Sequence, residues 1–352
     1  MIFFLVFVQT STLILSVVLP IVIKPVLEKL GIIDVPNARS SHTRPVLRGL
    51  GLATMIAMAG GFVMTLALSA GVSSRFSAAS GSTAYLLDPT ALILFVTIAL
   101  VSVAAGLMGL AEDLKGLRVM LRSALQLSLA LIAVTVFVSV TGQSWLWIPY
   151  GVLFISSYIN VANFMDGING ISGMHGVLAG ATFATAGLLS EQPWLAFAGV
   201  ILAAAFAGFL PWNFMGSGAF LGDVGSYLLG ASVATISIAA AVSGVPWLAT
   251  IAPMIFYFGD SAYTLVRRVR RGEKWYEAHK EHVYQRINQL GYSHLQTTAI
   301  ISAFTLVACA LGIASFWITG FAWWILLAGG LALTGLYLLM PRILPARHAR
   351  VA

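Results

Sequence analysis

The sequence predicts an all-α, polytopic integral membrane protein with about eleven transmembrane helices. Of its 352 residues, 59% are hydrophobic and only 9% are charged. An ordinary soluble domain carries about 25% charged residues, so this composition does not suit a surface exposed to water. Apolar stretches of about 18 residues or more recur along the chain, which is the length that a membrane-spanning helix needs. The basic residues are also sorted between the loops in a way that membrane topology explains.

The apolar stretches define the expected helices in order. The first begins at Met1 without a positively charged leader or a small-residue cleavage site, and we interpret it as a retained helix rather than a signal peptide. One domain, 1–340, contains all the spans, and a basic tail, 341–352, follows it. The predicted spans are 2–23, 50–70, 89–110, 120–140, 146–163, 172–189, 194–210, 223–242, 247–266, 297–317 and 322–340.

The distribution of Lys and Arg orients these helices. Of the 19 basic residues, all but Arg75 fall on one side of the predicted topology. Cytoplasmic loops carry the excess of Lys and Arg in membrane proteins. We therefore expect the N-terminus outside, the C-terminus inside and the polar motifs at the cytoplasmic face. Topology thus explains the net charge of +7, and nucleic-acid binding is not needed to account for it.

Two adjacent acids, Glu112 and Asp113, follow the third span on the predicted cytoplasmic side. Ionisable groups near membrane depth are costly and are functional candidates by default. A carboxylate pair at this position suits metal binding, proton transfer or the positioning of a phosphate. The structural alternative is a solvated helix end beside Lys115 and Arg118.

A second polar motif, residues 160–173, follows the fifth span and is rich in Asn, Asp and Gly. Asn163, Asp166 and Asn169 are spaced by three, so a helical turn would place them on one side. The glycines between them permit close approach of the backbone to a ligand. The structural alternative is an N-cap for the next span, which requires only one such residue.

A third motif places Asn213 and Phe220 shortly before Asp223, which opens the eighth span. A carboxylate at a helix N-terminus is stabilised by the helix dipole, so a cap is the structural interpretation. An oxygen ligand for a phosphate-bound Mg²⁺ is the functional interpretation. Asp223 has no basic neighbour in the sequence, which leaves its charge free for a cation. Phe220 could stack on a base, although a single aromatic residue more often serves packing.

Two predicted cytoplasmic loops carry most of the remaining donors. In the loop 267–296, His279 and His282 are three residues apart and would share one helical face. A zinc site there would need further ligands. A basic helix on the membrane surface and a site for the phosphates of an anionic substrate are the other interpretations. The loop 34–49 contains turn residues and donors, and its structural role would be to orient the first two spans.

Two polar residues fall inside predicted spans. We expect His175 to be a satisfied core histidine, which is the commoner situation. Asp260 could pair with a basic residue, and the sequence assigns it no function.

Together these motifs resemble those of the polyprenyl-phosphate N-acetylhexosamine-1-phosphate transferases, the WecA/MraY superfamily, and within it the WecA and WbpL branch. The resemblance covers residues 24–294. No motif is specific alone, but the set is specific jointly. It consists of Pro-Asn-x-Arg-Ser-Ser-His from Pro36, Asn-Phe-Met-Asp-Gly from Asn163, Gly-Asp-x-Gly-Ser from Gly222 and His-x-x-His-x-Tyr-Gln-Arg from His279.

The resemblance implies an enzyme that transfers an N-acetyl-sugar 1-phosphate from a UDP-sugar to undecaprenyl phosphate and releases UMP. It implies Mg²⁺ as the cofactor, with Mn²⁺ as a substitute, and a role at the start of O-antigen or another cell-surface glycan. It also implies a multi-pass protein of the bacterial inner membrane, surrounded by lipid, for which a homodimer is compatible. The sugar itself is left open among UDP-GlcNAc, UDP-FucNAc and UDP-QuiNAc.

The matched positions imply a role for each candidate residue. Asp113 and Glu112 are the catalytic acids that face the lipid phosphate, and Asp223 lies at the metal together with Asn163. The nucleotide sugar is bound by Asn163, Asp166, Asn169, Asn213 and Phe220. The diphosphate or the lipid phosphate is bound by His279, His282, Arg286, Lys115, His42 and Arg48.

Two residues depart from the family pattern. Glu112 stands where Asp is usual, which keeps the carboxylate but moves it by one methylene, and Asn169 stands where Asp is frequent, which argues against a metal role there. Two other classes of protein remain as alternatives: a transporter of a lipid-linked or nucleotide sugar, and a catalytically silent member of a glycan-assembly complex. A transporter predicts essential charges at mid-membrane depth with access from both sides.

Overall fold

A computed structural model describes residues 1–34, 46–80, 86–215, 219–274 and 279–347 and confirms the all-α class. Two short strands, β1 (Ile33–Asp34) and β2 (Val46–Leu47), form an antiparallel pair. The first six helices are α1 (Ile2–Lys29), α2 (Gly51–Ser80), α3 (Pro89–Lys115), α4 (Val119–Thr141), α5 (Trp147–Met165) and α6 (Ile171–Leu189). The remaining helices are α7 (Pro193–Phe214), α8 (Gly222–Val242), α9 (Trp247–Ile251), the 3-10 turn η1 (Ala252–Met254), α10 (Ile255–Arg270), α11 (Val283–Gln289), α12 (His294–Ala314) and α13 (Phe321–Ile343).

Nine helices in the described part of the chain are long and apolar enough to cross a membrane, and two of the eleven predicted spans are not among them. The predicted span 172–189 forms α6, which packs so closely on α7 that a Cβ on Gly180 would overlap the α7 backbone. A helix covered by protein does not need a surface that suits lipid. The predicted span 247–266 is broken into α9, η1 and α10 at Pro253, which lacks the backbone N–H that a continuous helix uses.

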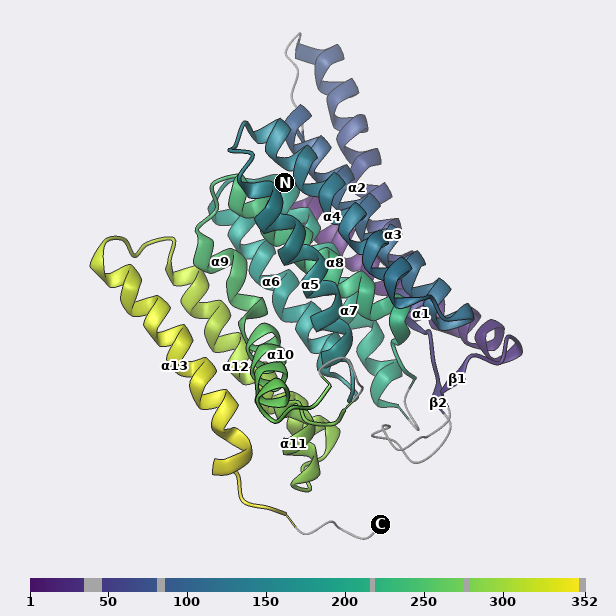
Figure 1. Ribbon diagram of the computed structural model, residues 1–352. Helices are drawn as coiled ribbons and strands as arrows, with labels where there is room; N and C mark the ends of the chain where they lie inside the picture. Colours follow the sequence, from purple (N-terminus) through teal and green to yellow (C-terminus); the bar gives the residue numbers. More distant parts are fainter. Residues whose placement is uncertain (35–45, 81–85, 216–218, 275–278, 348–352) are drawn as a thin grey trace.

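The long helices form one bundle with α8 near its centre and α13 on its rim (Figure 1). Within the most apolar window of each helix, 94% of α8 but only 6% of α13 is buried. α8 contacts α2, α3, α4 and α5, whereas α13 exposes large apolar side chains such as Phe321 and Trp324, as expected of a helix that faces lipid. The start of α8 is therefore the point where several helices converge.

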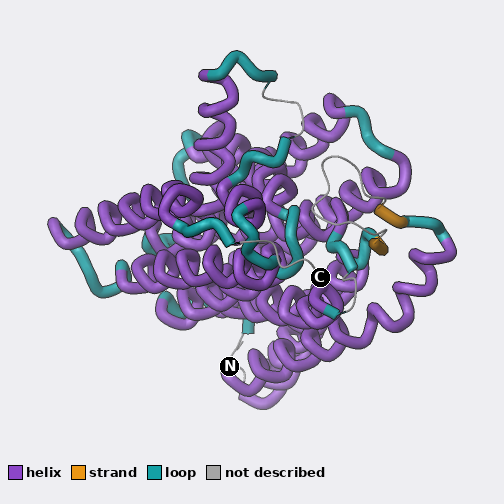
Figure 2. The backbone as a smooth tube through the Cα atoms, turned by 90° about the horizontal axis from the view of Figure 1, so that it is seen from below, coloured by secondary structure: helices purple, strands orange, loops and turns teal. Residues whose placement is uncertain are grey.

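The polar motifs gather at the end of the bundle that lies lowest in Figure 1 and faces the viewer in Figure 2. This end contains the strands, α11 and the last turns of α1, α3, α10 and α13. Each of those last turns carries a basic residue: Lys29, Lys115, Arg270 and Arg342. The sorting of charge expected from the sequence thus coincides with one physical end, and the assignment of that end to the cytoplasm remains a prediction.

Candidate active site

Asp113 joins the end of α3 to the start of α8. Its carboxylate accepts the backbone N–H of Asp223 at 3.1 Å and that of Val224 at 3.0 Å, and its side chain is fully buried. The first N–H groups of a helix have no partner within the helix, and an anion placed there is also stabilised by the helix dipole. The capping role that the sequence offered to Asp223 is therefore performed by Asp113, from a different helix.

Glycine allows α3 and α8 to approach each other at this point. Gly109 lies one turn before Asp113, and a Cβ on Gly109 would overlap the carbonyl of Asp223. Gly222 has a φ of +76°, and a Cβ there would lie 2.7 Å from Oδ2 of Asp113. A larger residue would meet both the strain of a positive φ and this overlap. The position of Asp113 thus depends on two small residues.

Arg48 bridges the two acids. Its Nε lies 2.8 Å from Oδ1 of Asp113, and its Nη2 lies 2.7 Å from Oδ2 of Asp223. The carbonyl of Leu47 accepts the N–H of Phe220, so the segment that follows β2 is fixed against the connection between α7 and α8. The expectation that Asp223 has a free charge was wrong, because its basic partner lies 175 residues earlier in the chain and could not be found from nearby sequence.

Asn163 reaches the same carboxylate from the end of α5. Its Nδ2 donates to Oδ1 of Asp223 at 2.7 Å and to Oγ of Ser226 at 3.0 Å. One oxygen of Asp223 is thus contacted by Asn163 and the other by Arg48, while the side chain stays 16% exposed. We call Arg48, Asp113, Asn163 and Asp223 the acid cluster.

Glu112 does not belong to the acid cluster. Its carboxylate accepts the backbone N–H of Leu117 at 2.8 Å and the guanidinium of Arg122 at 3.2 Å. Adjacent residues of a helix point in directions about 100° apart, so neighbouring acids do not face one target. The two acids therefore make separate contacts: Asp113 secures α8, and Glu112 secures the turn between α3 and α4. The catalytic role assigned to the pair stays a prediction.

Asp166 and Asn169 lie beyond the end of α5, so the single helical face predicted for them with Asn163 does not form. Oδ1 of Asp166 accepts the hydroxyl of Ser172 at 2.6 Å. Burial raises the pKa of Asp166 to about 7 against the effect of this hydrogen bond, and repulsion from Asp223 adds to the rise. Asp166 is therefore close enough to the acid cluster to sense its charge.

The side chains of the two other predicted amides differ in their contacts. Asn213 accepts the N–H of Gly170 and donates to the carbonyl of Ala219 at 2.9 Å, so it ties two loops of the site together. The N–H of Asn169 donates to Nδ1 of His294 at 3.3 Å, and its Oδ1 is buried without a hydrogen-bond partner among the described residues. Asn213 therefore connects the loop before α6 to the loop before α8 through its side-chain oxygen and nitrogen.

The remaining predicted residues are dispersed around this end. Phe220 and Arg286 are partly exposed, and Lys115 is exposed at the end of α3. His42 lies outside the described residues.

Comparison with known proteins identifies the scaffold that holds these residues. Residues 92–241, from α3 to α8, match glycosyl transferase family 4. The chain is 25% identical, over 90% of its own length and 87% of the relative's, to a probable undecaprenyl-phosphate N-acetylglucosaminyl 1-phosphate transferase of Bacillus subtilis. It is 27% identical, over 78% of its length and 73% of the relative's, to a decaprenyl-phosphate N-acetylglucosaminephosphotransferase of Mycobacterium tuberculosis. A phospho-N-acetylmuramoyl-pentapeptide-transferase of Clostridium beijerinckii is 27% identical over 47% of this chain and half of its own.

The family match and these relatives support the polyprenyl-phosphate N-acetylhexosamine-1-phosphate transferase superfamily that the motifs predict for this chain. The family match contains Asp113, Asn163 and Asp223. It leaves out Arg48 and the loop between α10 and α11 with His279 and His282, which we call the histidine loop. The two parts outside the match nevertheless lie at the same end of the transferase.

The histidine loop of the transferase differs from its prediction. α11 begins only at Val283, so His279 and His282 precede the helix, although their ring centroids lie 5.0 Å apart. Burial lowers the pKa of His279 to about 4, with the neighbouring His282 and Arg268 adding to the fall, so His279 is neutral at pH 7. His279 can thus donate or accept a hydrogen bond, but it does not add positive charge for a phosphate.

Much of the positive charge near this loop is already paired. Arg268 lies 3.0 Å from Glu273 and 3.1 Å from Glu281, and Arg271 pairs with the same two acids. These ion pairs hold the loop against the end of α10. A freely basic helix face on the membrane, one of the predicted alternatives, is therefore not formed by these two arginines.

Asp260, to which the sequence assigned no role, makes more hydrogen bonds than the other described acids near the loop. Its carboxylate accepts the backbone N–H of Val283 at 2.9 Å and of Tyr284 at 3.3 Å, and it lies 3.0 Å from Nδ1 of His282. The signal that could have found it is an acid inside a span followed by a histidine motif. His175, by contrast, is a core histidine as expected, with Nε2 at 2.7 Å from the hydroxyl of Tyr158, but its buried Nδ1 has no hydrogen-bond partner among the described residues, so it is satisfied at one nitrogen only.

The donor set fits a magnesium ion that shares its ligands with substrate. Mg²⁺ in phosphate-transferring sites is held by one or two carboxylates, with phosphate oxygens and water completing its shell. Asp223 supplies an exposed carboxylate, and Asp166 lies within its electrostatic reach. The described residues contain no group of three His, Cys, Asp or Glu side chains arranged as a complete metal site.

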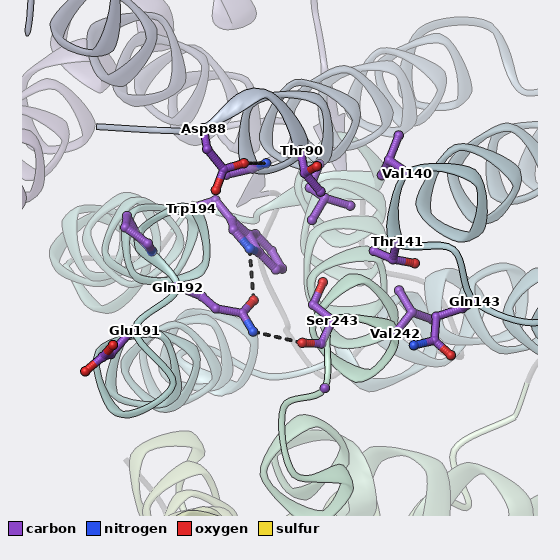
Figure 3. Close-up of a pocket in the computed structure, with 14 residues that line it drawn as sticks. Asp88, Thr90, Val140, Thr141, Gln143, Glu191, Gln192, Trp194, Val242 and Ser243 are labelled. Atoms are coloured by element: carbon purple, nitrogen blue, oxygen red, sulfur yellow. Dashed lines mark hydrogen bonds between the residues drawn. The ribbon is translucent and has the colours of Figure 1, made fainter. Parts of the chain in front are cut away.

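A cavity of about 460 Å³ lies far from the acid cluster, at the opposite end of the bundle (Figure 3). It is lined in part by Asp88 and Gln192, and the Gln192 side chain links the indole of Trp194 to the carbonyl of Ser243. Asp88 caps the start of α3 and Asp113 lies near its end, which separates the two acids by about 37 Å along the helix. This cavity is not part of the candidate active site.

Proposed function

We propose that the protein transfers an N-acetyl-sugar 1-phosphate from a UDP-sugar to undecaprenyl phosphate, releases UMP and thereby initiates O-antigen or another cell-surface glycan. The reaction class follows from the superfamily, and the names of the relatives from Bacillus and Mycobacterium support the N-acetyl-sugar and the polyprenyl acceptor. The basic helix ends support a cytoplasmic position for the site, in the inner membrane of a bacterium. The observation that carries the proposal is the convergence of three parts of the chain on Asp223: Asn163 of α5 and Arg48 contact its carboxylate, and Asp113 of α3 accepts its backbone N–H.

The acid cluster suits a reaction between two anions. Asn163 and Arg48 hold the two oxygens of Asp223 from opposite sides and so fix the direction of its remaining lone pairs. When bound at Asp223, Mg²⁺ supplies charge neutralisation to the diphosphate and polarises the leaving UMP oxygen. Arg48 is the cation of the cluster that can turn towards a phosphate without moving its backbone.

The lipid phosphate is the nucleophile in this proposal. With a second pKa near 6, a phosphate monoester is mostly dianionic at pH 7 and needs no strong base. The carboxylate oxygens of Asp113 accept hydrogen bonds from the start of α8 and pair with Arg48, which suits an orienting role. We therefore favour direct in-line attack by the lipid phosphate over a covalent aspartyl-phosphate intermediate.

A donor panel tests the proposal. The purified protein in detergent is given undecaprenyl phosphate, Mg²⁺ and, in turn, UDP-GlcNAc, UDP-FucNAc and UDP-QuiNAc, and UMP release is measured. We expect release with at least one donor, dependence on the lipid phosphate and loss on chelation of Mg²⁺, with Mn²⁺ restoring part of the rate. The absence of UMP with every donor would favour a transporter or a silent member of a glycan-assembly complex.

A further inference from the structure

The buried carboxylate of Asp260 collects hydrogen bonds from three helices. Besides the backbone N–H groups of Val283 and Tyr284, it accepts the hydroxyls of Thr264 at 3.2 Å and of Tyr337, on α13, at 2.8 Å. Nδ1 of His282 is its fifth neighbour, at 3.0 Å. Asp260 therefore links α10, α11 and the rim helix α13.

These contacts decide which nitrogen of His282 carries its proton. A backbone N–H can only donate, and a carboxylate surrounded by donors is an acceptor at both oxygens. We infer that Nδ1 of His282 donates to Asp260, because a bare Nδ1 would place its lone pair against a carboxylate oxygen. The capping box in which the ring also faces the backbone N–H of Gln285 would instead favour a bare ring nitrogen. In neutral His282 the free nitrogen is consequently Nε2. Nε2 makes no hydrogen bond to any residue that the structure describes.

A ring contact places His282 at the end of α5 that carries Asn163. Its ring stacks on Phe164, with centroids 6.4 Å apart, and Phe164 directly follows Asn163 in α5. The hydroxyl of Tyr284 donates to the carbonyl of Phe164 at 3.0 Å, which fastens the start of α11 to the end of α5. A ring held in this way at its Nδ1 side and on its face has one polar atom left to offer, Nε2.

We propose that Asp260 is a positioning residue of the transferase: it fixes the Nδ1–H tautomer of His282 and directs Nε2 towards the phosphates of the nucleotide sugar. The part that concerns substrate rests on the proposed function, whereas the tautomer does not. Asp260 itself touches no substrate in this arrangement and acts through His282.

Nitrogen NMR on the unaltered full-length protein tests the tautomer. With ¹⁵N-labelled imidazoles, and with His282→Gln to assign the resonance among the six histidines, we expect neutral His282 to show a protonated Nδ1 and a bare Nε2. A bare Nδ1 with a protonated Nε2 would overturn the proposal, and no variant of Asp260 has to fold for that result.

Addition of UDP and Mg²⁺ tests the direction of Nε2. We expect the Nε2 resonance to shift while Nδ1 stays bonded. If calorimetry shows that UDP binds and Nε2 does not respond, the positioning role is wrong; if UDP does not bind at all, the proposed function fails while the tautomer result stands.

Kinetics then separate action through His282 from simple support of α11. Asp260→Asn is expected to lower kcat/KM by about 10- to 100-fold, the loss usual when the carboxylate behind a working histidine is removed. In a His282→Gln background the same change should cost less than about threefold, because the two residues act as one unit. Losses that multiply would contradict the proposal. Tyr337→Phe is the matched control, since it removes one donor to Asp260 without altering His282.

Discussion

Two buried acids at the same end of the molecule do the same local task in different electrostatic surroundings. Asp113 accepts the first N–H groups of α8, and Asp260 accepts those of α11. Each lies on a different helix from the one that it caps. The additional partner of Asp113 is the cation Arg48, which it shares with the carboxylate of Asp223, whereas Asp260 is surrounded by Thr264, His282 and Tyr337.

The difference in partners has a physical consequence. Arg48 keeps 35% of its side chain exposed, so the ion pairs of the acid cluster can be exchanged for contacts with an incoming ion or phosphate. Asp260 is fully buried and its hydrogen bonds come from fixed groups of the protein. One capping carboxylate therefore lies in a site that can accept a ligand, and the other holds neighbouring groups in place.

The largest effect should come from Asp223, the partly exposed acid beside Asp113, which has no counterpart near Asp260. We expect Asp223→Ala to lower Mg²⁺-dependent UMP release by about 1,000-fold or more, which is about 4 kcal/mol of transition-state stabilisation. The control is Asp88→Ala, which removes an acid that caps α3 at the opposite end and should leave the rate within a few-fold. Retention of activity by the Asp223 variant would remove the metal from this position.

Gly109→Ala is the next largest, because it prevents α3 from approaching α8. The added methyl group would overlap the carbonyl of Asp223, and overpacking of this kind costs about 1–3 kcal/mol. Thermal unfolding in detergent, with and without lipid phosphate, measures the loss. Gly335→Ala is matched to it, since a Cβ on this helical glycine of α13 meets nothing within 4 Å, and it should be neutral or slightly stabilising.

Arg48→Gln tests whether the ion pairs of the acid cluster can be exchanged. Removing the guanidinium leaves Asp113 and Asp223 without their shared cation, at a cost of about 1–2 kcal/mol after allowance for its exposure. Added Mg²⁺ should recover part of this stability. Arg122→Gln breaks the pair with Glu112 and leaves the ion pairs of the acid cluster intact, so it should lose stability independently of Mg²⁺. Equal responses of the two variants to Mg²⁺ would contradict the distinction.

Asp166 should give an effect that depends on pH. Its pKa is raised from 3.8 to about 7, so the folded protein holds this proton more tightly than the unfolded chain does. The resulting stability is complete below pH 3.8 and is lost as the pH rises through about 7. Asp166→Asn should therefore gain stability relative to the native chain between pH 5 and pH 8, by about 2–3 kcal/mol. The melting temperatures of the two proteins are measured across this pH range. A difference between them that does not change with pH would count against the raised pKa.

The sequence predicts the helices and the end at which the polar residues gather, because composition and the sorting of charge act over whole segments. It predicts the partners of individual side chains less well. Arg48 and Asp223 are 175 residues apart, and Asp260 and Tyr337 are 77 apart, so only the folded bundle brings either pair together. The separate directions of Glu112 and Asp113 could have been inferred from helical geometry, whereas the loop position of Asn169 depends on where α5 ends.

The distance along the chain between Asp260 and its partners also bears on how the protein is made. A ribosome adds about 5–20 residues per second, so the 77 residues from Asp260 to Tyr337 take about 4–15 s to synthesise. During that interval α10 carries an acid whose hydroxyl partner on α13 does not yet exist. The carboxylate of Asp260 therefore lacks one of its hydrogen-bond donors until the last helix has been made, and we expect chains cut short after α12 to be less stable than the full chain.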